Sequence, residues 1–278
     1  MADATLADNL PRPAVCAMPW ASVNDIRLYY QAFGKGPALL FAHGAGGNHL
    51  SWWQQVPYFS ARYRCVVFDH RAFGRSLDSA GGGRRAFAED LRQLLDYLQI
   101  ESAALVAQSM GGRTAVGFAL RNPGRVQALV LAGTTGGAVN DDVRAAQEAH
   151  QRSPMGRRSL AARAISPRLR REQPELAFLY GLIGRLNPPR PRDFLAPIPG
   201  YRGSAAQALA ELGIPILFLV GAEDTITPPH IVQMAHQQVP GSQFDIIEGA
   251  GHSGYFERSD AFNRRVAQFL EESGWVAE

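Results

Sequence analysis

The chain has 278 residues and a formal net charge of +3, with 46% hydrophobic and 19% charged residues. These values are typical of a globular domain with a sizeable core, and they exclude a disordered or fibrous chain. The arginines that supply the positive charge form no compact basic stripe, so no nucleic-acid partner is expected. No stretch approaches the roughly 18 apolar residues of a membrane span, so no membrane partner is expected either.

The first 22 residues are expected to be a loose leader. They lack the continuous apolar segment of a signal peptide, so a cytoplasmic location is expected by default. Cys16 lies in this leader and Cys65 lies in an apolar run. Two cysteines do not make a disulfide framework, and Cys65 is expected to be a small buried hydrophobic residue.

Short apolar strands alternate with helical patterns along most of the chain. Strands are predicted over residues 26–31, 38–42, 64–68, 103–107, 126–132, 215–220 and 244–247. Helices are predicted over about residues 50–59, 85–99, 113–120, 228–238 and 257–271. This alternation predicts an α/β fold, in which helices cover both faces of a mostly parallel, doubly wound sheet.

Residues 137–204 interrupt the alternation. They contain helix-like segments and a proline-rich stretch but no strand, and they carry twelve arginines against six acidic residues. We predict that this segment forms a helical cap above the edge where the parallel strands end. The core domain would then consist of residues 1–136 and 205–278.

Ser109 lies between an apolar strand pattern and a helical pattern. The residues two positions before and after it are small, Ala107 and Gly111, as a sharp turn between a closely packed strand and helix requires. The free amides at the start of the helix would lie beside the hydroxyl, where they suit a developing oxyanion. The alternative is a serine that caps an ordinary helix.

This strand–serine–helix pattern resembles the nucleophile elbow of the α/β-hydrolase superfamily, Gly-x-Ser-x-Gly, with Ala107 at the first glycine. The resemblance implies that fold, with a helical cap inserted after the sixth strand, and a catalytic triad in the order Ser, acid, His. Residues 221–228 resemble the superfamily's Gly-x-x-Asp-x-x-x-Pro, which assigns the acid to Asp224 rather than Glu223. His252, in a glycine-rich loop after the last predicted strand, would be the base.

Two further motifs support the resemblance. His43-Gly44-Ala45 resembles the superfamily's His-Gly-x motif, which implies an oxyanion hole formed by the backbone N–H groups of Ala45 and Met110, with His43 bracing the loop. Residues 69–76 resemble the superfamily's Asp-x-Arg-Gly-x-Gly-x-Ser loop. We expect this loop to be structural, with an ion pair between Asp69 and Arg71.

The chemistry that the resemblance implies is acyl transfer through Ser109, without a metal or an organic cofactor. The expected substrate is a carboxylic ester or lactone of a small apolar compound. Hydrolysis of a C–C bond or an enol-lactone, or perhydrolysis, would use the same triad, and a non-catalytic ligand receptor would keep only the fold. A dinucleotide site at Gly44-Ala45-Gly46 with Asp69 is disfavoured, because His49 occupies the third glycine position.

The walls of the substrate pocket are less well defined by the sequence. Besides Gly44, the candidates are aromatic residues, although aromatic residues at such spacings also form cores: Trp52, Trp53, Phe178, Tyr180 and Tyr255. The arginine-rich cap permits the hypothesis that the substrate carries an anionic group. The expected partner is a small-molecule substrate, and the expected assembly is a monomer or a homodimer.

Overall fold

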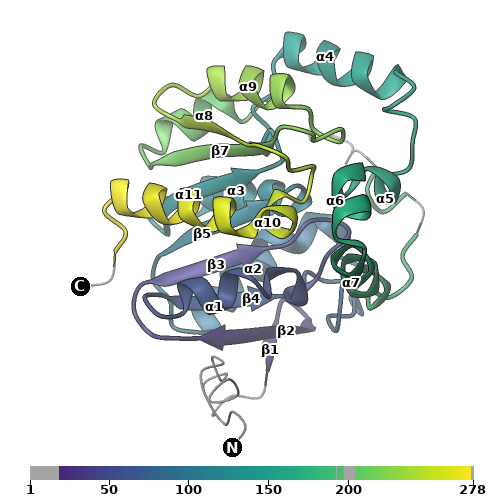
Figure 1. The fold of residues 1–278 in the computed structure, drawn as a ribbon. Helices are drawn as coiled ribbons and strands as arrows, with labels where there is room; N and C mark the ends of the chain where they lie inside the picture. The colour runs from purple at the N-terminus through teal and green to yellow at the C-terminus, as the bar shows by residue number, and fades with distance from the viewer. Residues whose placement is uncertain (1–18, 192, 197–203, 277–278) are drawn as a thin grey trace, which may run out of the picture.

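A computed structural model describes residues 19–191, 193–196 and 204–276 of the chain. Eight strands form one sheet in the order β1-β2-β4-β3-β5-β6-β7-β8. Their bounds are Trp20–Val23, Ile26–Phe33, Ala38–Ala42, Arg64–Phe68, Ala103–Gln108, Val126–Ala132, Ile216–Gly221 and Gln243–Ile247 for β1 to β8. Strand β2 runs antiparallel to β1 and β4, and every other neighbouring pair is parallel. The predicted mostly parallel α/β sheet is confirmed (Figure 1).

Helices cover both faces of the sheet because successive strand residues point to two separate cores. In β3, Leu40 and Ala42 belong to one core, and Leu39 and Phe41 belong to the other. The first core is covered by α2 (Phe87–Tyr97), α3 (Met110–Arg121), α8 (Ala206–Glu211) and α9 (Pro229–Gln237). The second is covered by α1 (Gln55–Phe59) and α11 (Ser259–Glu272). This arrangement is the doubly wound architecture that the sequence predicts.

Cys65 in β4 belongs to the second core and is fully buried, as predicted. Burial raises the pKa of its thiol to about 12, so the group remains a neutral hydrophobic filler at physiological pH. Cys16 and the rest of residues 1–18 lie outside the described residues.

Two predicted segments differ from the structure. Residues 20–22, assigned to the leader, belong to β1, which pairs with β2 from Trp20 opposite Tyr29. The single helix expected over residues 50–59 is divided into a 3-10 turn, η1 (His49–Trp52), and α1. Pro57 explains the break, because its ring excludes the carbonyl of residue 53 and it has no N–H to bond that carbonyl.

Besides α8, four helices lie between β6 and β7 in the described part of the chain. They are α4 (Asp141–Arg152), α5 (Leu160–Arg163), α6 (Pro167–Glu172) and α7 (Pro174–Arg185). Helix α4 packs against α9, whereas α5, α6 and α7 lie together beside the edge where the parallel strands end (Figure 1). The loops that follow β3, β5, β7 and β8 therefore meet under α5 to α7. The remaining described helical turns are η2 (Gly83–Ala86) and α10 (Gly254–Glu257).

Candidate active site

Ser109 occupies a strained turn between β5 and α3. Its backbone has φ 51° and ψ −113°, a left-handed conformation that side-chain-bearing residues rarely adopt. Its N–H donates to the Ala132 carbonyl at 2.8 Å, which ties the turn to the neighbouring strand β6. Two residues later, a Cβ on Gly111 would lie 2.3 Å from the Ala42 carbonyl oxygen. Close packing of α3 on the end of β3 thus holds the turn in a conformation that would otherwise relax.

Asp224 and His252 form a buried pair on the loops that follow β7 and β8. The distance from Asp224 Oδ2 to His252 Nδ1 is 2.8 Å, and the two residues are 3% and 7% exposed. The other carboxylate oxygen, Oδ1, accepts the backbone N–H groups of Ile226 and Thr227 at 2.7 and 2.9 Å. These donors fix the orientation of the carboxylate, so that Oδ2 faces His252 Nδ1; an imidazole that donates from Nδ1 to Oδ2 has Nε2 as an acceptor.

Ser109 and His252 line the same cavity, whose volume is about 610 Å³. Its walls come from the strand-end loops and from the inserted helices. The lining residues are Ala45, Gly46, Gly47, Arg84, Gln108, Ser109, Met110, Leu160, Ala161, Ala164, Ile165, Arg170, Ala177, Tyr180, Gly181, Gly184, Arg185, Asn187, Arg190, Leu195, Ile226 and His252. The two predicted oxyanion positions, Ala45 and Met110, therefore border the same space as Ser109. Met110 is the first residue of α3, so its N–H has no intrahelical acceptor.

The loop that carries Ala45 is braced by buried histidines. His43 Nδ1 lies 2.8 Å from the Gly44 carbonyl, and its Nε2 accepts the backbone N–H of His70 at 3.0 Å. Burial lowers the pKa of His43 to about 4, so the ring is neutral at physiological pH and can make both contacts at once. His43 is also absent from the cavity lining, so it faces the loop and the core rather than a substrate.

Gln108 connects three of the loops, a role that the sequence did not reveal. Its Nε2 donates to the His252 carbonyl at 3.3 Å, and a Cβ on Gly44 would lie 1.9 Å from its Oε1. Its side chain therefore fills the space between the histidine loop and the oxyanion loop, directly before Ser109. The available signal was a polar residue at the end of an otherwise apolar strand.

Known proteins resemble this chain over most of its length. The family model described as "alpha/beta hydrolase fold" matches residues 37–164, and the one described as "TAP-like protein" matches residues 199–275. The 3-oxoadipate enol-lactonase 2 of Acinetobacter baylyi is 29% identical over 265 residues, which cover 90% of this chain and 95% of that protein. The chain belongs to the α/β-hydrolase superfamily.

Solved structures agree with this assignment. A thermophilic esterase from Thermogutta terrifontis superposes with a TM-score of 0.76 at 25% identity, covering 93% of this chain and 99% of its own. An N-acyl homoserine lactone degrading enzyme superposes with a TM-score of 0.74 at 27% identity, covering 90% of this chain and 100% of its own. The membership predicted from the four motifs is confirmed.

In this α/β-hydrolase, the adjacent residues Glu223 and Asp224 contact different partners. Glu223 Oε1 accepts a bond from Arg168 Nε of α6 at 3.1 Å, while Asp224 contacts His252. The structure thus brings Asp224, and not its neighbour, to the imidazole.

Most of the predicted pocket residues lie elsewhere. Trp52 and Tyr255 are buried against each other, with ring centroids 4.7 Å apart, in the core beneath the site. Trp53 and Phe178 are 43% and 63% exposed and do not line the cavity. Gly44 does not line it either, because it packs against Gln108. Of the predicted set only Tyr180 lines the cavity, and it also bonds Ser253. Aromatic side chains are drawn into the core by their apolar area, which explains this outcome.

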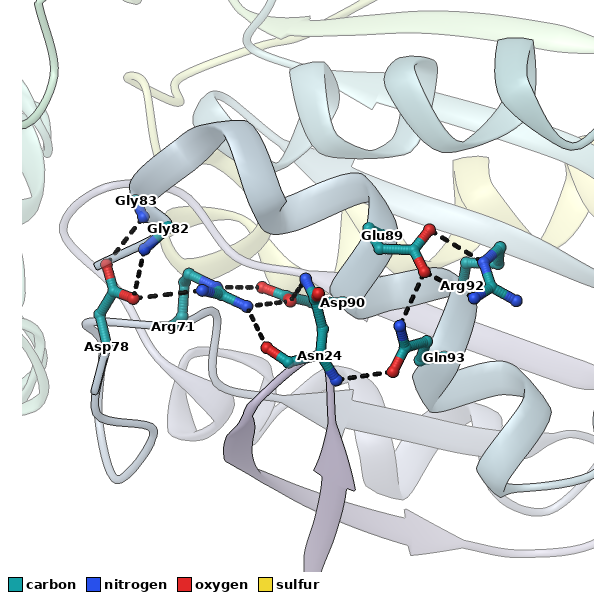
Figure 2. Close-up of polar contacts among 9 residues, drawn as sticks. All are labelled: Asn24, Arg71, Asp78, Gly82, Gly83, Glu89, Asp90, Arg92 and Gln93. Carbon is teal, nitrogen blue, oxygen red and sulfur yellow. Dashed lines mark hydrogen bonds and ion pairs between the residues drawn. The ribbon is translucent and has the colours of Figure 1, made fainter. Parts of the chain in front are cut away.

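The predicted ion pair between Asp69 and Arg71 is wrong. Arg71 instead donates from Nε to Asp90 of α2 at 2.6 Å, and from Nη1 to Asp78 at 3.2 Å, as Figure 2 shows. Asp69 bonds the backbone and ring of His49 and the N–H of Arg75. The two side chains leave the loop in different directions, so each finds a partner that is distant in sequence.

The structure also bears on cofactors. Asp69 is fully buried within its own contacts and cannot reach a ribose hydroxyl, which removes the dinucleotide alternative at Gly44-Ala45-Gly46. Among the described residues, no group of three or more His, Cys, Asp or Glu side chains is placed to hold a metal ion. No helix within the described ranges has the length and apolar character needed to cross a membrane.

Proposed function

We propose that the protein is a serine hydrolase that cleaves a carboxylic ester or lactone through an acyl-enzyme. The observation that carries this proposal is the arrangement of three residues. Ser109 lies on a strained turn and lines the same cavity as His252. The Nδ1 atom of His252 lies 2.8 Å from Asp224 Oδ2. This is the set of groups that activates a serine hydroxyl.

The reaction follows from these positions. His252 Nε2 takes the proton of the Ser109 hydroxyl as Oγ attacks the substrate carbonyl carbon. The negative oxygen of the tetrahedral intermediate is then stabilised by the N–H groups of Ala45 and Met110, which are fixed before the reaction and need no reorganisation. Collapse breaks the bond to the alcohol oxygen, which receives the proton from His252.

Water completes the cycle. His252 accepts a proton from a water molecule that attacks the acyl carbon, and collapse of the second intermediate returns that proton to Ser109 Oγ and releases the carboxylic acid. With a lactone, the alcohol remains tethered to the acyl group, so a single hydroxy acid leaves. Asp224 accepts the hydrogen bond from Nδ1 and stabilises the imidazolium.

An enol-lactonase, an esterase and an N-acyl homoserine lactone degrading enzyme are among the proteins similar to this chain, and they support an ester or lactone substrate. A 2-hydroxy-6-oxononadienedioate/2-hydroxy-6-oxononatrienedioate hydrolase is 26% identical, so hydrolysis of a C–C bond by the same triad is the alternative function. We also propose that the segment 137–204 acts as a cap. Residues of α5, α6 and α7, with Asn187, Arg190 and Leu195 after them, supply the cavity wall that faces the strand ends. The walls from this segment would select the substrate.

Hydrolysis of p-nitrophenyl acetate and butyrate tests the proposal. Ser109→Ala should lower kcat/KM by on the order of 10³-fold or more, and should abolish labelling by a fluorophosphonate read by intact mass. Asp224→Asn should also lower kcat, although by less than the loss of the nucleophile. Glu223→Gln is the matched control, because this adjacent carboxylate contacts Arg168, and it should retain wild-type activity.

Two results would contradict the assignment. A larger loss in Glu223→Gln than in Asp224→Asn would show that the acid is misassigned. A folded wild-type protein that neither turns over nor labels would favour a ligand receptor with a hydrolase fold.

A further inference from the structure

The cavity beside Ser109 is lined by positive charge without negative charge. Four arginines line it, Arg84, Arg170, Arg185 and Arg190, and no aspartate or glutamate appears among its described lining residues. Within the ranges that the structure describes, none of the ion pairs involves any of the four. Arg170 and Arg185 are exposed, so water screens their charge. Arg84 and Arg190 are partly buried, so screening by water does not account for how their positive charge is stabilised.

Arg190 lies against the loop that carries the proposed oxyanion hole. Its Nη1 donates to the Ala72 carbonyl at 3.1 Å and its Nη2 to the Ala45 carbonyl at 3.4 Å. Its guanidinium carbon is 3.9 Å from the centroid of the Phe73 ring, so one face of the group is stacked. Burial lowers the pKa of this guanidinium, and no neighbouring carboxylate offsets that cost.

Arg84 approaches the same region from η2. Its Nε donates to the Phe194 carbonyl at 2.7 Å, and its Nη2 donates to the Ala196 carbonyl. Phe194 in turn packs on Phe73, with ring centroids 5.8 Å apart, so both arginines border one aromatic cluster. Burial lowers the pKa of Arg84 as well, and the positive charge of Arg113 adds to the effect.

Each of these guanidiniums has N–H groups that the contacts above do not use. An arginine carries five N–H groups, and the contacts above use two in Arg190 and two in Arg84. The carbonyl partners satisfy hydrogen bonds but leave the charge uncompensated. A carboxylate that entered the cavity would supply both the acceptors and the opposite charge, in the two-point geometry that arginine favours.

We propose that Arg190 and Arg84 form an anion subsite that binds a carboxylate carried by the ester or lactone substrate. The inference rests on the proposed function, because it specifies the class of substrate that reaches Ser109. It develops the hypothesis that the substrate carries an anionic group by assigning that group to two particular arginines. Since Arg190 contacts the Ala45 carbonyl and Met110 borders the same aromatic cluster, the bound carboxylate lies on the oxyanion side of the cavity.

Matched esters that differ only in one charge test the subsite. Mono-p-nitrophenyl glutarate is compared with its methyl ester, which places the charge on the acyl side. The pair 4-acetoxybenzoate and methyl 4-acetoxybenzoate places it on the alcohol side. In at least one pair, the ratio of kcat/KM for the charged to the neutral ester should be about tenfold or more. The ratio should fall between ionic strengths of roughly 0.01 M and 1 M, over which the Debye length shrinks about tenfold.

Variants identify the arginines responsible. Arg190→Met keeps the aliphatic packing on Phe73 and removes the charge, so the ratio should drop by about tenfold. Arg190→Lys keeps the charge without the two-point geometry and should retain part of the preference. Arg84→Gln gives a second, independent test should Arg190→Met fold poorly. Arg264→Gln, an exposed arginine of α11, is the control and should leave the ratio unchanged.

Binding to the Ser109→Ala variant separates this inference from the proposed function. Glutarate should bind this variant by isothermal titration, and the additional Arg190→Met change should abolish that binding. Serine-dependent hydrolysis with equal rates for charged and neutral esters, and no glutarate binding, would overturn the subsite and leave the hydrolase assignment intact. Glutarate binding that depends on Arg190, in a protein that cleaves and labels with nothing, would retain the subsite and overturn the hydrolase.

Discussion

Gly111 shows how one residue fixes the position of the candidate nucleophile. It lies where the start of α3 passes the end of β3, and the closest atoms to its missing Cβ are backbone atoms of Ala42 and His43. Backbone atoms in the middle of a sheet cannot move aside as the end of a flexible side chain can. The conformation of Ser109 therefore depends on the absence of a side chain at position 111.

Gly111→Ala should therefore reduce both stability and activity. Its Cβ would meet the Ala42 and His43 carbonyl oxygens at 2.3 and 2.8 Å, and overpacking of this kind costs about 1–3 kcal/mol. Urea unfolding should show that loss, and fluorophosphonate labelling of Ser109 should slow. Gly181→Ala in α7 is the control, because no atom lies within 4 Å of its added Cβ, and it should raise stability by about 0.5–1 kcal/mol. Equal effects of the two changes would contradict the argument.

The sequence predicted the candidate triad because its residues follow strand patterns at motif spacings. The arginines of the cavity could not be assigned in the same way. Arg190 lies in a proline-rich stretch without periodicity, and it reaches the site only because Asn187 and Arg190 bond Gly74, Ala72 and Ala45 across the fold. The aromatic candidates failed for a related reason, since the sequence does not distinguish a ring in the core from a ring in a pocket wall.

At the scale of elements, a buried polar network joins the β1–β2 turn, the loop after β4 and helix α2. Arg71 donates to Asp90, to Asp78 and to the Asn24 carbonyl, while the Asn24 amide donates to Asp90 at 2.7 Å (Figure 2). The apolar face of α2 was predictable from the spacing of Leu91, Leu94 and Leu95, which are fully buried. The partner of Arg71 was not, because Asp90 lies on a polar position of a helix 19 residues away.

Asp90→Ala should destabilise the protein by about 3–5 kcal/mol, because it leaves the Arg71 charge buried and unpaired by its main partner. Glu89 is the adjacent control, because its pair with Arg92, also shown in Figure 2, is only partly buried. Glu89→Ala should cost less than about 1 kcal/mol. Chemical denaturation of both variants measures the difference, and similar losses would argue against the buried network as a stabilising element.

At the scale of the whole molecule, the order of strands and helices was sufficient to predict the architecture. Apolar strands alternating with helices permit few arrangements other than a parallel sheet covered on both faces. The edge strand β1 was missed because Trp20–Val23 is short and follows a proline-rich segment. The placement of the helices between β6 and β7 depends on tertiary contacts such as that of α4 with α9, which periodicity alone does not encode.

The buried histidines should make the stability of the whole fold sensitive to acid. Burial lowers the pKa of His43 to about 4 and also lowers that of His70, whereas both titrate near 6.5 when unfolded. Because the folded pKa lies below the unfolded one, their contribution is complete above about pH 6.5 and is lost as the pH falls toward 4. His43 alone accounts for roughly 3 kcal/mol.

Urea unfolding at pH values of about 7.5, 6 and 5 measures this loss. Glu257, whose pKa burial raises, contributes in the opposite sense, since its share is lost as the pH rises. His43→Gln should flatten the acid limb, and His230→Gln, at an exposed position of α9, should not. An acid limb that is the same in wild type and His43→Gln would assign the effect to other groups.

The helices α4 to α7 follow β6, and the chain returns to the sheet at β7. This insertion separates the residues of the proposed triad from many of the residues that form the cavity wall. Ser109, Asp224 and His252 lie on turns and loops that directly follow strands of the sheet, whereas much of the wall around them comes from the helices α5, α6 and α7 and the residues after them. A mutant library confined to these helices would therefore alter the shape and charge of the cavity while the residues of the proposed triad kept their positions. For laboratory evolution the fold thus offers a segment that can be varied next to a part that must be preserved.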